Sequence, residues 1–440
     1  MPFRPARILA QPLLLIGLGA GPASAGTMSY VFGPAKGSTD TTVVQPSDRY
    51  TANKGYGFED GKVPVIVPGK GLSAVVSDQA FLFSVRVPEG DYQVDVILGD
   101  PKEATETTIR AEQRRLFFEL VKVKPGASTG RRLLVDVRTP AIAGGEQISL
   151  KPREIGFANW DEKLTLEFDG PHPAVQLIEI TPIPHPKTVY LAGDSTVTDQ
   201  DREPWCSWGQ MLPRFLDSTV AVANYAESGE TARSFIGEHR WAKVLSVVQK
   251  GDYVFLQFGH NDQKDKRPNA GAYTTYTDTL RGMVADVRAH GAIPVLLTSM
   301  NRRTFDFDNR VTNSLGDYPD AVRKLAKDEG VALIDLNAMT KTLYEAWGPE
   351  IAKKAFVHYL PNSFPGQDKE IKDDTHFCNY GAYELARLVT NGIRTAVPDL
   401  MPDLDPGVPK FDPAHPDSVD AFALPHSPGS RAFQVPAQAK

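Results

Sequence analysis

The spacing of the apolar residues changes once along the chain, and this change divides the sequence into two parts. Over residues 30–181 apolar and polar residues alternate, as in 81–87 and again in 92–98 after a Pro-Glu-Gly-Asp turn. A period of two, in short segments separated by Gly, Pro and Asp turns, is typical of half-buried antiparallel strands. We therefore predict an all-β sandwich of the jelly-roll type over residues 28–182.

After a stiff linker at 182–186, continuous apolar runs replace the alternation, and stretches of helical periodicity separate them. The runs are 189–192, 253–258, 293–298 and 332–336. Strands that are apolar on both faces belong to a parallel sheet that helices cover on both sides. The sequence thus predicts a doubly wound α/β sandwich over residues 187–398.

The two ends of the chain differ from its body. Two arginines precede a largely apolar run at 8–19, and Ala23-Ser24-Ala25 has the small residues of a cleavage site. This pattern predicts a signal peptide at 1–25 and export, either to the periplasm or out of the cell. Residues 401–440 are rich in proline without a clear period, so we expect a tail that either lies on the surface or is disordered.

Charge and composition exclude several classes of function. The net charge of −6 over 440 residues argues against a nucleic-acid partner, because duplex binding requires a basic face. No apolar run is long enough to span a bilayer. The sequence has no His-Glu-x-x-His zinc motif and no complete phosphate-binding loop. We expect no cofactor and no metal.

Four short motifs follow one another in the second part, and together they supply the groups needed for acyl transfer through a serine. They are Gly193-Asp194-Ser195, Asn224-x-Ala226-x-x-Gly229, Gly259-His260-Asn261-Asp262 and Asp373-x-x-His376. The first three follow predicted strands directly, and the carboxyl ends of parallel strands meet at one edge of a sheet. We expect Ser195 to be the nucleophile at that edge.

His376 is the candidate base for Ser195. Asp373 lies three residues earlier and can place its carboxylate on the ring nitrogen that faces away from the serine. There it would fix the tautomer and stabilise the imidazolium. Asp374 is a rival for this role, and the spacing does not exclude it.

Three groups are candidate donors for an oxyanion: the backbone N–H groups of Ser195 and Gly229 and the side-chain amide of Asn261. Glycine suits this place because a residue without Cβ lets the main chain approach a substrate closely. An ordinary strand-end turn for Gly229 and a capping role for Asn261 are the alternatives.

Candidate substrate contacts lie near the same predicted edge. They are Trp205, Arg233, His260 and Arg302. A tryptophan can stack on a sugar ring, and arginines that follow strands pair well with the carboxylates of an acidic sugar chain. Core packing for the tryptophan and solvated loop charges for the arginines are the alternatives.

The chain has two cysteines, Cys206 and Cys378, which follow the serine and the histidine of the motifs. We expect both near the same cleft, and in an oxidising compartment an even count permits one disulfide. Such a bridge would hold the histidine loop against the serine loop. Two separate buried thiols are the alternative that the sequence leaves open.

The four motifs resemble those of the SGNH hydrolase superfamily, also called GDSL esterases, and within it the rhamnogalacturonan acetylesterases. The resemblance covers about residues 187–398. It implies a flavodoxin-like α/β/α sandwich without metal, with Ser195, Asp373 and His376 as triad and Gly229 and Asn261 completing the oxyanion hole. The first part resembles the galactose-binding-like sandwich attached to some bacterial relatives.

The resemblance implies an exported serine carbohydrate esterase that removes acetyl groups from pectic polysaccharide. Its partner would be acetylated plant cell-wall polysaccharide or oligosaccharide. An exported esterase or lipase acting on acetylated xylan or other acyl esters is a second hypothesis, and a non-catalytic carbohydrate-binding protein is a third. The chain departs from the fungal members at Glu230-Thr231, where Arg-Ser is expected, which puts a charge of opposite sign near the cleft.

Overall fold

The alternating segments of the first part form two sheets. The computed structural model describes residues 26–33 and 41–428, and the predicted signal peptide at 1–25 lies outside them. The first sheet has the order β10 (Thr129–Val137), β7 (Gly90–Leu98), β12 (Ala174–Pro182), β1 (Met28–Phe32) and β2 (Thr41–Val44). In the same sheet β12 also pairs with β5 (Ala74–Val76), which pairs with β4 (Val65–Val67). The second sheet has the order β3 (Tyr56–Phe58), β6 (Phe81–Arg86), β11 (Lys163–His172), β8 (Thr105–Ala111) and β9 (Arg115–Val123). We call the residues up to Pro182 the front sandwich.

One face of each sheet contributes to a shared core. In β7 every second residue is buried, which is the period of two that the sequence predicts. Rings from both sheets meet in the centre, where Phe32 of the first sheet packs edge-on against Phe83 of the second at 6.1 Å between ring centroids. Strand pairing is antiparallel apart from the parallel pair β1–β2. Apolar burial between the two sheets is therefore what holds the front sandwich together.

The second part contains a five-stranded parallel sheet. Its order is β14 (Val220–Asn224), β13 (Lys187–Gly193), β15 (Tyr253–Gln257), β16 (Ile293–Leu297) and β17 (Ala332–Ile334). Alternate residues of β13 face opposite layers, because Val189 and Leu191 belong to one apolar core and Tyr190 and Ala192 to another. Burial on both faces explains the continuous apolar runs and confirms the predicted α/β sandwich. We call the residues from Lys187 onward the α/β part.

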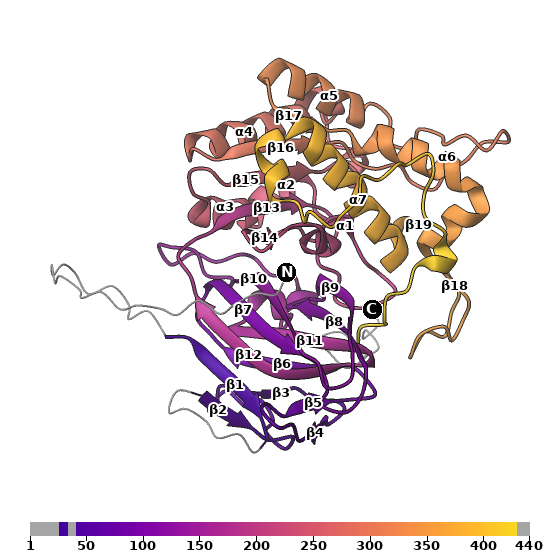
Figure 1. The fold of residues 1–440 in the computed structure, drawn as a ribbon. Helices are drawn as coiled ribbons and strands as arrows, with labels where there is room; N and C mark the ends of the chain where they lie inside the picture. Colours follow the sequence, from indigo (N-terminus) through magenta and orange to yellow (C-terminus); the bar gives the residue numbers. More distant parts are fainter. Residues whose placement is uncertain (1–25, 34–40, 429–440) are drawn as a thin grey trace.

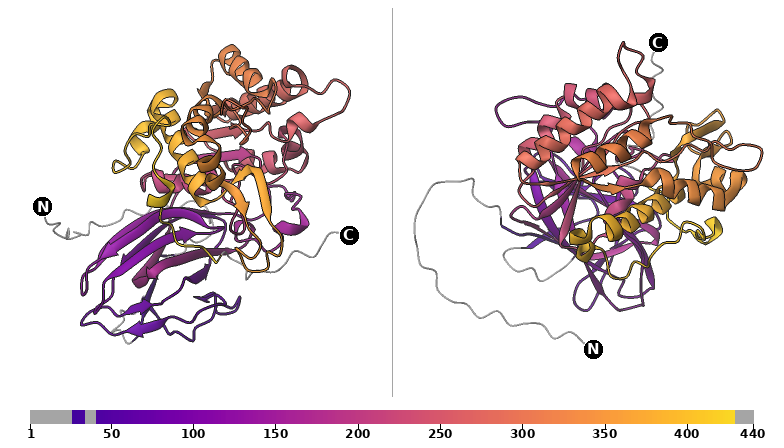
Figure 2. Two further views of the ribbon diagram at one scale, coloured as in Figure 1. Left: turned by 90° about the vertical axis from the view of Figure 1, so that its right-hand side faces the viewer. Right: turned by 90° about the horizontal axis from the view of Figure 1, so that it is seen from above.

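Helices cover both faces of this sheet (Figures 1 and 2). One layer contains α1 (Trp208–Met211), α6 (Leu336–Ala355) and α7 (Asn379–Ala396). The other contains α2 (Ala232–Gly237), α3 (Arg240–Val247), α4 (Thr277–Ala289) and α5 (Tyr318–Glu329). Across the described ranges, no helix has the length and apolarity that crossing a membrane would need. The strand order reverses beside β13, so the chain leaves β13 at the switch point where open α/β sheets bind ligands.

A short antiparallel hairpin, β18 (Phe356–Tyr359) and β19 (Ile371–Phe377), lies beyond the parallel sheet. Its second strand contains the Asp373-x-x-His376 motif. The backbone N–H of Cys206 donates to the carbonyl of Phe377 at 2.8 Å, and this bond joins the hairpin to the segment that follows β13. The histidine and serine loops are therefore held side by side by main-chain pairing.

Buried arginines of the front sandwich bind the edge of the parallel sheet. Arg115, at the start of β9, donates from Nη1 to the Val222 carbonyl of β14 at 3.0 Å. Arg138, directly after β10, donates to the Asn224 carbonyl at the end of the same strand. Both arginines are at most 1% exposed. Edge strands leave carbonyl groups without sheet partners, and these guanidinium groups supply the missing donors.

The C-terminal segment crosses both parts of the protein (Figure 1, yellow). Asp417 accepts from Arg387 of α7 at 2.6 Å through its carboxylate. Further on, the carbonyl of Pro425 accepts from Arg110 of β8 at 2.6 Å, and Ser427 donates to Glu167 of β11 at 2.7 Å. Of the two expectations for the tail, attachment to the surface therefore holds as far as residue 428.

We predict that replacing Arg138 destabilises the protein far more than replacing a neighbouring exposed arginine. Arg138→Met leaves the Asn224 carbonyl and Asp136 without their buried donor, which should lower the free energy of unfolding by about 3–5 kcal/mol. Arg132→Met removes an exposed pair with Asp95 and should cost less than about 1 kcal/mol. Urea unfolding followed by fluorescence and circular dichroism measures both, and equal losses would contradict the prediction.

Candidate active site

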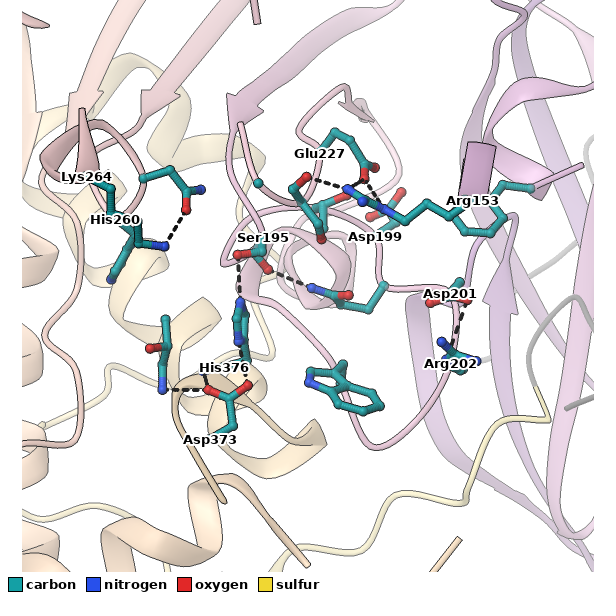
Figure 3. A pocket seen from close by; sticks show the side chains of 18 residues that line it. Arg153, Ser195, Asp199, Asp201, Arg202, Glu227, His260, Lys264, Asp373 and His376 are labelled. Carbon is teal, nitrogen blue, oxygen red and sulfur yellow. Dashed lines mark hydrogen bonds and ion pairs between the residues drawn. The ribbon is translucent and has the colours of Figure 1, made fainter. Parts of the chain in front are cut away.

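A cavity of about 450 Å³ opens at the carboxyl ends of β13, β14 and β15 (Figure 3). Residues from both parts of the chain line it. They are Arg153, Phe157, Ser195, Thr198, Asp199, Gln200, Asp201, Arg202, Trp205, Glu227, Ser228, Gly229, His260, Asn261, Lys264, Asp373, Thr375 and His376. The structure thus brings residues of all four sequence motifs to one place.

A continuous hydrogen-bonded chain connects three side chains of the cavity. His376 Nε2 lies 2.7 Å from Ser195 Oγ, and His376 Nδ1 lies 2.7 Å from Asp373 Oδ2. Figure 3 shows the three side chains in one row. Ser195 has 8% of its surface exposed, so its hydroxyl faces the cavity from a largely buried position. This geometry lets the imidazole take the serine proton while the carboxylate orients the ring.

The carboxylate of Asp373 is held in its ionised form. Burial would raise its pKa, but the hydrogen bond from His376 and the N–H groups of Thr375 and His376 outweigh burial and lower the pKa to about 2. Those two N–H groups donate to Oδ1 at 2.9 and 3.0 Å. Asp373 therefore remains charged at any pH well above 2, and its support of the imidazole is lost only as the pH falls through that value.

The rival carboxylate, Asp374, points elsewhere. Its Oδ1 accepts from Arg303 Nε at 2.6 Å and lies 2.8 Å from His358 Nε2. In a regular strand the period of two would put Asp374 on the side of His376. The register of β19 shifts between Asp373 and Phe377, and this irregularity turns His376 toward Asp373 instead. The structure assigns the position beside His376 to Asp373.

The turn that presents Ser195 is stabilised by the aspartate before it. Asp194 Oδ1 accepts from the Thr196 N–H at 2.9 Å and from the Thr196 hydroxyl at 2.7 Å. A side chain that bonds the backbone two residues on mimics a turn and fixes the chain direction. His260 Nδ1 lies 3.5 Å from the other oxygen of Asp194. The order Gly-Asp-Ser thus has a local reason, since the aspartate holds the serine at the end of β13.

The three candidate oxyanion donors lie around the cavity. Within the described residues, the N–H groups of Ser195 and Gly229 make no hydrogen bond to another protein group. Asn261 Nδ2 donates one bond, to the Glu230 carbonyl at 3.0 Å, and a primary amide has a second hydrogen to donate. Gly229 adopts φ +85°, a conformation that favours glycine, while a Cβ there would make only an ordinary contact with Lys151 Nζ at 3.9 Å. Its backbone angle is therefore what requires a glycine there.

Two of the four candidate substrate contacts line the cavity, and two do not. Trp205 and His260 line it, although His260 is only 2% exposed. Arg233 lies in a separate small pocket with Asp265. Arg302 is partly buried behind the site and donates to the His260 carbonyl and the Thr375 hydroxyl at 3.2 Å each. The prediction of a direct substrate contact is therefore corrected for both arginines, because their positions after strands did not fix where the side chains point.

Several lining residues were missed by the sequence analysis. Arg153 and Phe157 belong to the loop between β10 and β11 of the front sandwich, and no motif marks them. Arg153 donates to Glu227 Oε1 from Nε at 3.0 Å and from Nη2 at 2.5 Å. Burial, followed by the neighbouring Glu154, raises the pKa of Glu227 to about 7 against the opposing effect of Arg153. Only the packing of the two parts brings these groups to the cavity.

Glu230, which stands where arginine is expected in the fungal members, does not place an unpaired negative charge in the cleft. Glu230 is fully buried, and its carboxylate is bonded by Lys151 of the front sandwich. Its other oxygen accepts from the Ser234 hydroxyl at 2.5 Å. The acidic side chain at this position is therefore neutralised by a partner from the other part of the chain.

The two cysteines are free thiols, which corrects the alternative of a disulfide. Cys206 Sγ donates to Gln210 Oε1 at 3.1 Å, and Cys378 Sγ donates to the Lys354 carbonyl at 3.2 Å. Each sulfur thus has its own acceptor. Burial raises the pKa of Cys206 to about 12. Main-chain pairing between Cys206 and Phe377 joins the two loops instead.

The described residues contain no group of three or more His, Cys, Asp or Glu side chains arranged to hold a metal ion. The groups that are present suffice for acyl transfer: a hydroxyl, an imidazole oriented by a carboxylate, and amide donors around one cavity. The arrangement can bind an ester carbonyl, form an acyl-serine and release it to water.

Comparison with known proteins agrees with this chemistry. Residues 191–376 match the model of the GDSL-like Lipase/Acylhydrolase family. Rhamnogalacturonan acetylesterase RhgT of Bacillus subtilis is 43% identical over 210 residues, which cover 47% of this chain and 90% of RhgT. Probable rhamnogalacturonan acetylesterase YesY of the same organism is 36% identical over 47% of this chain and 92% of YesY. The uncharacterized esterase YxiM, also of Bacillus subtilis, is 29% identical over 70% of this chain and 78% of YxiM.

We predict that Asp373→Asn and Asp374→Asn have very different effects on hydrolysis of a small acetyl ester. Loss of the carboxylate that orients the imidazole should lower kcat on the order of 10⁴-fold. Loss of the partly exposed pair of Asp374 with Arg303 should lower it less than about tenfold. Initial rates of both variants, measured side by side with matched thermal unfolding, check this, and a larger loss in Asp374→Asn would reverse the assignment.

Proposed function

We propose, since the chain belongs to the GDSL-like lipase/acylhydrolase family, that it is a serine esterase that removes acetyl groups from pectic polysaccharide of the rhamnogalacturonan type. The observation that carries this proposal is the hydrogen-bonded row of Ser195, His376 and Asp373 at the edge of the parallel sheet. The similarity to RhgT supports the choice of substrate, because that relative is a rhamnogalacturonan acetylesterase.

In the proposed reaction Ser195 Oγ attacks the acetyl carbonyl while His376 Nε2 takes the hydroxyl proton. The negative charge that develops on the carbonyl oxygen is stabilised by the N–H groups of Ser195 and Gly229 and by the amide of Asn261. His376 then gives its proton to the departing sugar oxygen, which leaves an acetyl-serine. A water molecule, deprotonated by the same imidazole, releases acetate and restores the hydroxyl.

The cavity has a cation at its rim that can pair with an acidic sugar chain. Three cationic side chains line it, namely Arg153, Arg202 and Lys264. Four carboxylates line it as well, and two of them, Glu227 and Asp201, pair with Arg153 and Arg202. Lys264 is exposed at the rim, and its Nζ donates to Asn261 Oδ1 at 2.9 Å, so its charge is not paired with a carboxylate of the described residues. Trp205 offers an apolar surface in the same cavity on which a sugar ring can stack. A uronate residue next to the acetylated sugar would find donors for its carboxylate at this rim.

We predict that acetate release distinguishes acetylated rhamnogalacturonan from acetylated xylan. A hydrogen bond to a charged group is worth about 1.5 kcal/mol, so kcat/KM should be about tenfold higher on the acidic polymer. Ser195→Ala should abolish release from both while its unfolding curve matches the parent protein. Equal rates on the two polymers would contradict the pectic substrate and leave the esterase in place.

We also propose export, which the pattern of residues 1–25 supports. Expressed with its native N-terminus in a bacterial host, the protein should be recovered outside the cytoplasm and begin near Gly26. Cell fractionation and N-terminal sequencing measure this. Replacing the apolar run at 8–19 with polar residues is the control, and an uncleaved cytoplasmic product from the native sequence would contradict export.

A further inference from the structure

Two cations of the front sandwich bind the carbonyl of one peptide group at the active site. Lys151 Nζ donates to the Ser228 carbonyl at 2.9 Å, and Arg153 Nη2 donates to the same oxygen. The nitrogen of that peptide group belongs to Gly229, the proposed middle donor of the oxyanion hole. The C=O and N–H groups of a trans peptide lie in one plane and point in opposite directions. Holding the carbonyl therefore also sets the direction of the N–H.

We propose that Lys151 and Arg153 are positioning residues of the oxyanion hole: they orient and polarise the Ser228–Gly229 peptide so that its N–H is aimed at the developing oxyanion. This inference rests on the proposed function, in which Gly229 is an oxyanion donor. Neither side chain touches the reacting atoms. Both act through the peptide group that they bind.

The Ser228–Gly229 peptide group needs to be held in place because a glycine follows it. Gly229 has φ +85° and no side chain, so rotation of the preceding peptide plane meets little steric resistance. A charged donor makes a shorter and stronger hydrogen bond than a neutral one. Two charged donors on one carbonyl therefore restrain the plane, and they also draw electron density toward the oxygen, which strengthens the N–H on the other side as a donor.

The two cations are themselves held on both sides of the peptide. Lys151 also bonds Glu230, the residue after Gly229, and Arg153 bonds Glu227, the residue before Ser228. The two carboxylates flank the peptide along the chain. The segment 227–230 is therefore bound to the front sandwich at its beginning, middle and end.

A buried network fixes the loop from which the two cations extend. Lys151 directly precedes the short 3₁₀ segment Pro152–Glu154, and Arg153 belongs to it. The buried Glu154 accepts from Arg240 Nη1 and from Trp160 Nε1 at 3.0 Å each. Glu154 also accepts from the backbone N–H of Lys151 at 2.8 Å. The cations thus extend from a rigid support, which is the condition under which an electrostatic site is already organised before the reaction.

The test uses Lys151→Met and Arg153→Met, which keep an unbranched apolar side chain and remove the charge, together with the conservative Lys151→Arg and Arg153→Lys. The substrate is a small acetyl ester whose leaving group is too short to span the cavity. Rates are expressed per serine titrated by a fluorophosphonate, so that only folded, functional sites are counted. Lys163→Met, which removes an ion pair with Glu59 elsewhere in the front sandwich, is the matched control.

We expect each Met variant to lower kcat about tenfold, with KM within about twofold, since loss of a whole oxyanion donor costs about 10²–10³-fold. The conservative variants should recover most of kcat, and Lys163→Met should match the parent protein. A boronic acid that forms a tetrahedral adduct on the serine should bind each Met variant more weakly, by about the factor lost in kcat/KM. Binding of the ground-state ester is expected to change little.

Three results would overturn the inference: kcat unchanged in both Met variants, a rise in KM with kcat retained, or a fall in kcat without weaker boronate binding. Failure of the proposed function is a separate outcome, which Ser195→Ala and the parent protein show without the Lys151 and Arg153 variants. Activity retained by Ser195→Ala would remove the acyl-serine mechanism, whereas activity on the small ester without release from pectin would remove only the substrate.

Discussion

The rest of the structure depends on one constraint. Arginine side chains of the front sandwich are buried against the edge of the parallel sheet and bind its carbonyl groups. Arg115 and Arg138 occupy positions where β14 presents carbonyl groups without a strand partner. Arg114 does the same for the carbonyls of Gln200 and Trp205 in the segment after Ser195. A buried carbonyl without a donor is costly, so each of these bonds makes the two parts depend on one another. The loops that line the cavity begin at these fixed points.

The fold could be predicted from the sequence because burial imposes a periodic pattern on the apolar residues. Alternation in 92–98 identified a strand with one buried face, and the uniform run 253–258 identified a strand buried on both. The strand order could not be predicted in this way, because every apolar run of a covered parallel sheet has the same pattern. The motifs filled that gap in part, since Ser195, Gly229 and Asn261 each follow a strand and must lie at its carboxyl end.

The site could be predicted from the sequence where it depends on residues that lie close together along the chain. The sequence alone left Asp373 and Asp374 open, because both lie within reach of His376 along the chain. The structure separates them through backbone bonding: the Asp373 carboxylate accepts the N–H groups two and three residues on, which bends β19 and returns the chain toward its own side chain. Arg153 and Phe157 could not be found from sequence, because they reach the cavity from a different sheet. The disulfide between Cys206 and Cys378 could be proposed from the motifs beside them, but the sequence does not determine the direction in which each sulfur points.

The ion pair between Lys151 and Glu230 links the front sandwich to the candidate active site. The match with RhgT covers 90% of that protein but 47% of this chain, which leaves RhgT little length for a counterpart of the sandwich. An α/β part without a sandwich has no Lys151, and Glu230 would then keep only the Ser234 hydroxyl and the more distant Arg240, at 3.9 Å, as partners. With the sandwich present, the same glutamate anchors the cation that binds the Ser228 carbonyl. The acidic residue at 230 and the loop at 151–154 are therefore physically linked, because Lys151 pairs with the buried Glu230 beside the proposed oxyanion hole.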